Sequence, residues 1–237
     1  MPDPLPIDEP NLQLARVRFQ RLQWLWAALL AGMAILTWFT VGDRYPLAVL
    51  PWLLAAVLLS AVPQPALLAL AALVWALSLT YLIPGMAAIF GPDPISQILG
   101  ASTIEVLGRA AVRLVMAIAA WTQFMQYRLL YGTIRASGLP EDFRPIPQLV
   151  PNWTSQLALA AAGLGLLGVT FGLLPAATAA GDLILPQLGY TSAILAFGLG
   201  LGVAFSPTDR RPAALAGMVL GFIAFLLAAA FPSLAVS

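Results

Sequence analysis

Three charged residues at helical spacing lead into a long apolar run, and they are the residues best placed to do chemistry. Glu105, Arg109 and Arg113 precede a largely apolar segment that extends to Tyr127. On a helix, residues three and four apart lie on one face. The face that begins at Glu105 comprises positions 105, 109, 113, 116, 120, 123 and 127 and reads Glu, Arg, Arg, Met, Ala, Gln, Tyr. Because a charge beside hydrocarbon needs a partner, a wet cavity or a route to the interface, Glu105, Arg109, Arg113 and Gln123 form the candidate intramembrane polar or anion site.

Each of these residues also has a structural interpretation. Glu105 is the fourth residue of Ser102-Thr103-Ile104-Glu105, which fits a helix capping box. It also neutralises Arg109 if the two side chains pair. A single carboxylate cannot offset two arginines, so the second guanidinium either extends to the outer headgroups or binds an anionic lipid, a substrate or a partner carboxylate. Gln123 either lines a polar path or forms a hydrogen bond between helices.

The composition predicts that these residues belong to an all-α polytopic membrane protein. The chain has 237 residues, of which 61% are hydrophobic and 9% are charged, whereas soluble domains carry about 25% charged residues. Several apolar runs approach the roughly 20 residues that cross a bilayer as a helix. Helices also satisfy their own backbone hydrogen bonds in lipid.

Missing residue types exclude several functions. The chain has no His and no Cys, and all of its eleven Lys and Arg residues are Arg. This excludes thiol chemistry, the usual zinc and haem ligands and a lysine Schiff base. A net charge of +1 gives no support for nucleic-acid binding. We therefore expect a protein that is not an enzyme and that carries no cofactor and no metal.

About seven spans are expected, with six to eight as the range. Residues 1–21 are expected to form a cytoplasmic tail and an amphipathic interfacial helix. Residues 22–131 are expected to hold four transmembrane helices, with an outer interfacial segment at 94–101. The expected spans are 22–41, 47–62, 66–83, 103–131, 157–180, 188–205 and 213–231. Arginine is concentrated in the segments that are inside if the N-terminus is cytoplasmic, which predicts that the C-terminus lies outside. The absence of Lys with abundant Ala, Leu, Gly and Arg indicates a GC-rich bacterial gene, so we expect a bacterial inner-membrane protein.

Residues 132–156 form the one sizeable polar connection, which we expect to be a cytoplasmic Pro-rich loop. Its prolines are spaced too closely for a regular element. The loop carries charges of both signs and is a candidate site for a partner, although simple solvation of a connector explains it as well. The candidate partner-binding residues are Arg135, Glu141, Asp142 and Arg144.

Residues 157–237 are Gly- and Ala-rich and are expected to hold the last three spans. Each of these spans has one pair of glycines four residues apart, a spacing that lets helix backbones approach closely. The candidate helix-packing pairs are Gly168 and Gly172, Gly198 and Gly202, and Gly217 and Gly221.

Two functions fit this pattern. The first is a membrane transport protein or the membrane-embedded component of a transporter, with an unknown substrate. The second is a non-catalytic accessory or scaffold subunit of a larger membrane complex. The expected partners are the lipid bilayer and either other membrane subunits or further copies of the chain.

Overall fold

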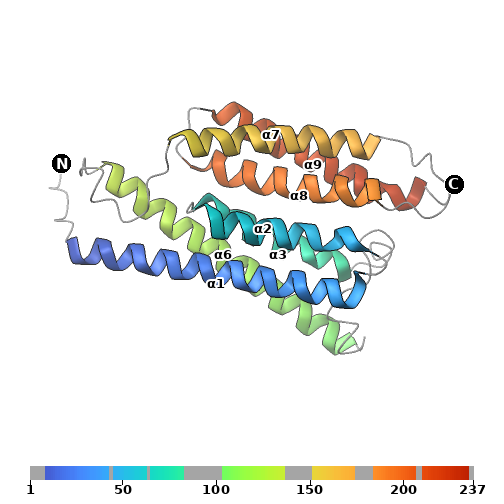
Figure 1. The fold of residues 1–237 in the computed structure, drawn as a ribbon, viewed down its shortest axis with the longest axis horizontal. Coiled ribbons are helices and arrows are strands. Elements are labelled where there is room, and N and C mark those ends of the chain that lie inside the picture. The colour runs from blue at the N-terminus through green and yellow to red at the C-terminus, as the bar shows by residue number, and fades with distance from the viewer. Residues whose placement is uncertain are drawn as a thin grey trace.

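The computed structural model consists of helices over the residues that it describes, which are 9–42, 45–62, 65–82, 103–136, 151–173, 184–206 and 210–234. Its elements are α1 (Glu9–Val41), η1 (Pro46–Val49), α2 (Leu50–Ala61), α3 (Ala66–Leu77), η2 (Ser78–Leu82), α6 (Thr103–Ala136), α7 (Pro151–Leu173), α8 (Ile184–Ala204) and α9 (Arg211–Leu234). The long helices lie roughly along one axis and alternate in direction (Figure 1).

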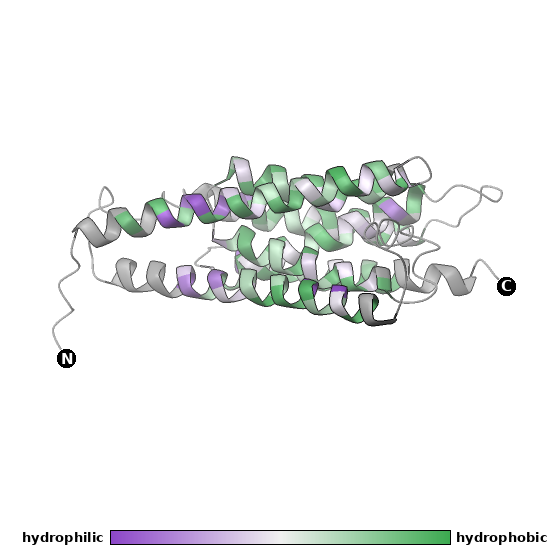
Figure 2. Cartoon of the chain, turned by 90° about the horizontal axis from the view of Figure 1, so that it is seen from below, coloured by the Kyte–Doolittle hydropathy of each residue, from purple (hydrophilic) through white to green (hydrophobic). Residues whose placement is uncertain are grey.

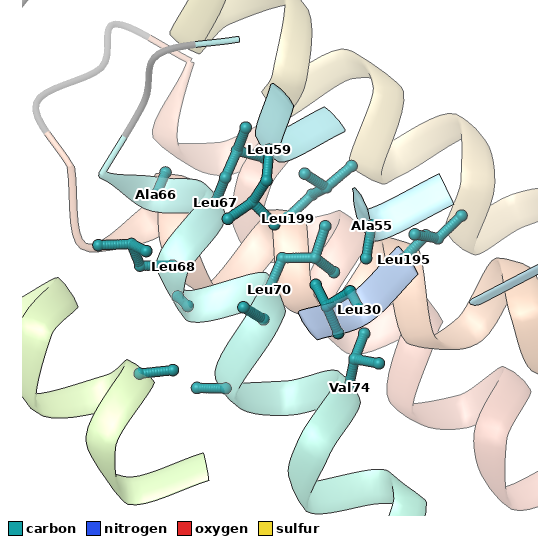
Figure 3. Close-up of a cluster of buried hydrophobic side chains, with 14 of the residues drawn as sticks. Leu30, Ala55, Leu59, Ala66, Leu67, Leu68, Leu70, Val74, Leu195 and Leu199 are labelled. Atoms are coloured by element: carbon teal, nitrogen blue, oxygen red, sulfur yellow. The ribbon is translucent and has the colours of Figure 1, made fainter. Parts of the chain in front are cut away.

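Helix α3 is the centre of the bundle. Leu67, Leu68 and Leu70 are fully buried, as expected for a helix that is apolar on every side. The helix packs against α6 on one flank and α8 on another, with α2 beside it. Figure 3 shows its leucines meeting Leu59 of α2 and Leu199 of α8 in one apolar cluster.

The helices form two groups that meet at α3 and α8. Helices α7, α8 and α9 pack against one another, while α1, α2, α3 and α6 lie on the other side of the bundle (Figure 1). Helix α8 belongs to the first group and also packs along α3. We call the end of the bundle with the start of α1, the end of α6 and the α8–α9 turn the Arg128 end. The opposite end, with η2 and the starts of α6 and α8, is the Arg113 end.

The expected lead-in segment and the first span belong to one helix over the described residues. Helix α1 runs unbroken from Glu9 to Val41. Its one proline, Pro10, lies in the first turn, where no intrahelical N–H bond is needed. The side chains of Phe19 and Trp26 are buried, and the Phe19 ring lies 4.7 Å from the ring of Tyr127 on α6. The expected apolar face of the lead-in segment therefore packs inside the bundle.

The helices on either side of the expected loop 132–156 extend into it. Helix α6 continues to Ala136 and α7 begins at Pro151, so both ends of the expected loop are helical. Proline suits the first position of a helix, because that position needs no intrahelical N–H bond. Helix α7 is described as far as Leu173, and residues 174–180 of the expected span lie outside the described residues. The expected interfacial segment 94–101 lies outside the described residues.

Three helices are long and apolar enough to cross a membrane, judged by length and composition over the described residues. They are Val17–Val41, Ser155–Leu173 and Gln187–Ala204. Shorter apolar helices occupy Leu47–Ala61, Ala66–Thr80 and Arg211–Leu227. Hydrophobic residues dominate the middle of the bundle, and hydrophilic ones gather toward its two ends (Figure 2).

Candidate polar site at the end of α3

The polar stripe of α6 lies on the face turned into the bundle. Arg113 is 1% exposed and Arg109 is 7% exposed, although both carry a permanent charge. Further along the same face Ala120 is fully buried, and Gln123 and Tyr127 are partly buried. The opposite face of α6 exposes Val115 and Ile118. The structure therefore places both arginines among the packed helices.

The end of α3 supplies the groups that Arg113 meets. A single span was expected over 66–83, but the α-helix stops at Leu77 and tightens into the 3₁₀ helix η2. The Ser78 hydroxyl donates to the Trp75 carbonyl at 2.6 Å, and the Thr80 hydroxyl donates to the Leu77 carbonyl at 2.6 Å. Such local bonds offer the backbone an alternative to the α-helical pattern. They leave polar carbonyl oxygens at a helix C-terminus inside the protein.

Three elements meet at these carbonyls. Arg113 Nη1 donates to the Ser78 carbonyl at 2.9 Å. The Tyr190 hydroxyl of α8 lies 3.1 Å from Thr80 Oγ1 and 3.5 Å from the Leu77 carbonyl. A guanidinium is favourable at a helix C-terminus, where the macrodipole is negative. The polar site therefore joins α6, η2 and α8.

Helix α8 carries two further buried polar residues close to Tyr190 in the sequence. Gln187 and Thr191 are both buried and lie one turn apart on α8. Sequence reasoning missed Ser78, Thr80 and Tyr190 as members of the site. Their signal was a Ser and a Thr at the end of an apolar helix, together with polar residues three and four apart in α8.

The other predicted site residues lie apart from this cluster. Gln123 accepts a hydrogen bond of 2.6 Å from the indole Nε1 of Trp26, so it joins α6 to α1. Glu105 is in the first turn of α6, and its side chain lies outside what the structure describes. Arg135 is in the last turn of α6, likewise without a described side chain. The remaining candidate partner-binding residues, Glu141, Asp142 and Arg144, lie outside the described residues.

The predicted glycine pairs lie at helix contacts, but they do not all face the same partner. A Cβ atom on Gly168 would lie 2.9 Å from the Ala224 Cβ, and one on Gly172 would lie 2.8 Å from the Leu227 Cβ. A Cβ on Gly217 would lie 2.6 Å from the Ala161 carbonyl carbon, and one on Gly221 would lie 2.7 Å from the Phe197 nitrogen. The third pair faces α3 instead, because Gly198 meets Leu70 and Gly202 meets the backbone of Ala66.

The charged groups at the polar site are guanidiniums. Arg113 donates to the Ser78 carbonyl of η2, near the Thr80 and Tyr190 hydroxyls, and Arg109 is buried one turn earlier on α6. The described helices contain just two carboxylates, Glu9 and Glu105, and both lie in first turns. Guanidinium groups bind carboxylates and phosphates through paired N–H donors. Comparison of the chain with protein-family models, curated proteins and solved structures gives no match.

Proposed function

We propose that the chain is a polytopic membrane protein with about seven spans. The proposal is supported by the three helices that are long and apolar enough to cross a bilayer. It is also supported by large apolar side chains on the outside of the bundle, such as Phe39 at 82% exposure and Trp24 at 62%. Water-exposed surfaces rarely carry apolar patches of this kind, whereas lipid favours them.

The distribution of arginine supports an inner-membrane orientation with the Arg128 end in the cytoplasm. The exposed arginines Arg18, Arg21, Arg210 and Arg211 lie on the helix segments of that end, together with Arg128. Cytoplasmic ends of spans are enriched in Lys and Arg in this way. The N-terminus is then cytoplasmic and the C-terminus lies outside a bacterial inner membrane.

The protein works as a transport protein, or as the membrane-embedded component of a transporter, for a substrate with an anionic group. The observation that carries this proposal is the near-complete burial of Arg109 and Arg113 within an apolar bundle. Ionisable residues at such depth mark substrate or ion pathways more often than they serve stability. The polar groups of η2 and α8 beside them would complete a binding site at the start of such a pathway.

A flux measurement tests this function. Purified protein is reconstituted into liposomes, and charge movement is recorded on solid-supported membranes with chloride, inorganic phosphate and succinate as probes. We expect a signal with at least one probe, and we expect Arg113→Gln to abolish it while the variant still assembles as a monodisperse species. The matched control is Arg211→Gln, which removes the same charge from an exposed position. Normal flux in Arg113→Gln overturns the proposal.

The alternative function is a scaffold subunit of a membrane complex. It is favoured by the broad exposed apolar surface of α1, which a second membrane protein would cover as well as lipid does. Purification of a tagged copy from its native membrane in mild detergent separates the two functions. Other chains that elute in fixed ratio would establish the subunit role, whereas a protein that elutes alone supports the transporter.

A further inference from the structure

The Arg128 end carries a second cationic cluster that is independent of the Arg113 site. Arg128 lies on α6 with its Cζ 5.2 Å from the centre of the Phe205 ring, which follows α8. Trp121 lies about two turns before Arg128 on the same side of α6. Its ring meets the Phe205 ring edge-on, with the ring centroids 6.2 Å apart. Trp121, Met125, Arg128 and Phe205, here called the α6–α8 seam, therefore join the two groups of helices at this end.

The charge of Arg128 is held in place without an ion pair among the described residues. Its described contacts are the Phe205 ring and a 4.0 Å approach of Nη1 to the Met125 sulfur. A ring face fixes a guanidinium plane but leaves the N–H edges free to donate. Arginine carries five N–H donors, so most of the donor capacity of Arg128 remains for an external acceptor.

The surface next to the seam changes from polar to apolar along α6. Thr122 and Gln126 are exposed near Arg128, and Ile118 and Leu114 are exposed about three and four turns before Arg128 on α6. From Ile118 to Arg128 a helix rises about 15 Å. A phospholipid fits this arrangement, because its headgroup can bind Arg128 while an acyl chain lies along the exposed apolar residues of α6. Phe205 is 40% exposed and offers the acyl chain a second apolar surface.

The positive charge at the Arg128 end favours an anionic lipid. Arg18 and Arg21 on α1 and Arg210 and Arg211 at the start of α9 lie at the same end of the bundle (Figure 1). Basic residues near a membrane surface attract anionic lipids. Trp and Tyr rings also prefer the headgroup level, and Trp121 and Tyr127 both lie within two turns of Arg128 on α6.

We propose that the α6–α8 seam binds one anionic phospholipid, whose phosphate accepts hydrogen bonds from Arg128 and whose acyl chain lies along Ile118 and Leu114. The inference rests on the membrane location proposed above and does not depend on transport. The bound lipid would tie α6 to α8 at the end opposite the Arg113 site.

Binding is tested with the delipidated full-length protein in detergent. Dioleoylphosphatidylglycerol, dioleoylphosphatidylcholine and inorganic phosphate are titrated separately, and bound lipid is counted by native mass spectrometry. Trp fluorescence follows the same titrations, since Trp121 lies in the seam. We expect one phosphatidylglycerol per chain and a Kd at least five times larger for Arg128→Gln. We expect no comparable binding of phosphatidylcholine or inorganic phosphate.

The matched control distinguishes a site from general attraction. Arg211→Gln removes the same charge at the same end of the bundle but lies outside the seam. Equal weakening by Arg128→Gln and Arg211→Gln overturns the proposal, and so does saturation by inorganic phosphate alone. If Arg128→Gln fails to fold, Phe205→Leu removes the ring and keeps the charge, and it must weaken binding. A protein that binds the lipid at the seam but shows no flux would separate this inference from the transport function.

Discussion

The two groups of helices are held together by different kinds of contact. Helices α7, α8 and α9 meet through glycine backbones and alanine methyl groups, as where Gly217 lies against Ala161. Helices α1, α2, α3 and α6 meet through large side chains, as where the Trp52 and Trp75 rings stack edge-on at 5.3 Å. Close backbone approach leaves no space for a side chain or ligand between helices. Wide, side-chain-filled contacts can hold polar groups, and the buried arginines lie on that side of the molecule.

The difference between the two groups is tested most strongly by replacing a glycine in the group of α7, α8 and α9 with a larger residue. We expect Gly217→Val to destabilise the protein by about 3 kcal/mol, at the upper end for overpacking, because its side chain would meet the backbone of α7. Unfolding in detergent with increasing denaturant, followed by circular dichroism, measures the loss.

Two open glycines provide controls for this substitution. Gly163 on α7 and Gly32 on α1 have no heavy atom within 4 Å of a built Cβ. Alanine at either position should be neutral or stabilise the helix by about 0.5 to 1 kcal/mol, since glycine is a poor helix former. If Gly217→Val unfolds no earlier than Gly163→Ala, close packing is not what holds the C-terminal group together.

The next largest effect is expected in the other group, at Arg113. Replacement by Gln removes a charged hydrogen bond to the Ser78 carbonyl inside the bundle. A hydrogen bond to a charged group contributes about 1.5 to 3 kcal/mol, and we expect a loss in that range for Arg113→Gln in the same unfolding assay. The exposed Arg18 is the control, and Arg18→Gln should be neutral. Equal stability of the two variants would show that the buried guanidinium contributes nothing to folding.

Several features of the fold could be predicted from the sequence alone. The long apolar runs predicted an all-helical chain, and the structure confirms it over the described residues. The spacing of Arg109 and Arg113 predicted a shared helix face, and both arginines are buried on α6. These features follow from periodicity along a single segment, which sequence alone contains.

Contacts between segments could not be predicted. The sequence predicted one continuous span over 66–83. It did not predict the change to a 3₁₀ helix, because the bonds from the Ser78 and Thr80 hydroxyls to backbone carbonyls depend on local geometry that hydropathy does not encode. It also could not place Tyr190 beside Thr80, since the two residues are 110 positions apart. The glycine spacing predicted close helix contacts, but not that Gly202 would face α3 rather than α9.

A smaller effect is expected where α1 meets α6. Trp26→Phe keeps most of the buried ring but removes the N–H that donates to Gln123 at 2.6 Å. A neutral hydrogen bond of this kind contributes about 1 kcal/mol, so we expect a loss of that size in chemical unfolding. Trp24→Phe is the matched control, because Trp24 is largely exposed. Similar losses in both variants would mean that ring size matters at Trp26 and the hydrogen bond does not.

The smallest effect tests α8, the helix that belongs to both groups. Tyr190→Phe removes a hydroxyl 3.1 Å from Thr80 Oγ1, but the Thr80 hydroxyl still donates to the Leu77 carbonyl. Part of the network therefore survives, and a coupling of about 0.5 to 1 kcal/mol is expected from the double-mutant cycle of Tyr190→Phe and Thr80→Val. The control cycle pairs Tyr190→Phe with Thr170→Val, whose hydroxyl donates to its own helix at Leu166 and is exposed. That cycle should show no coupling. Equal coupling in both cycles would mean that the Tyr190 hydroxyl does not hold α8 to the end of α3. The contact between the two helices would then rest on the packing of Gly198 and Gly202 against Leu70 and Ala66 in the first half of α3.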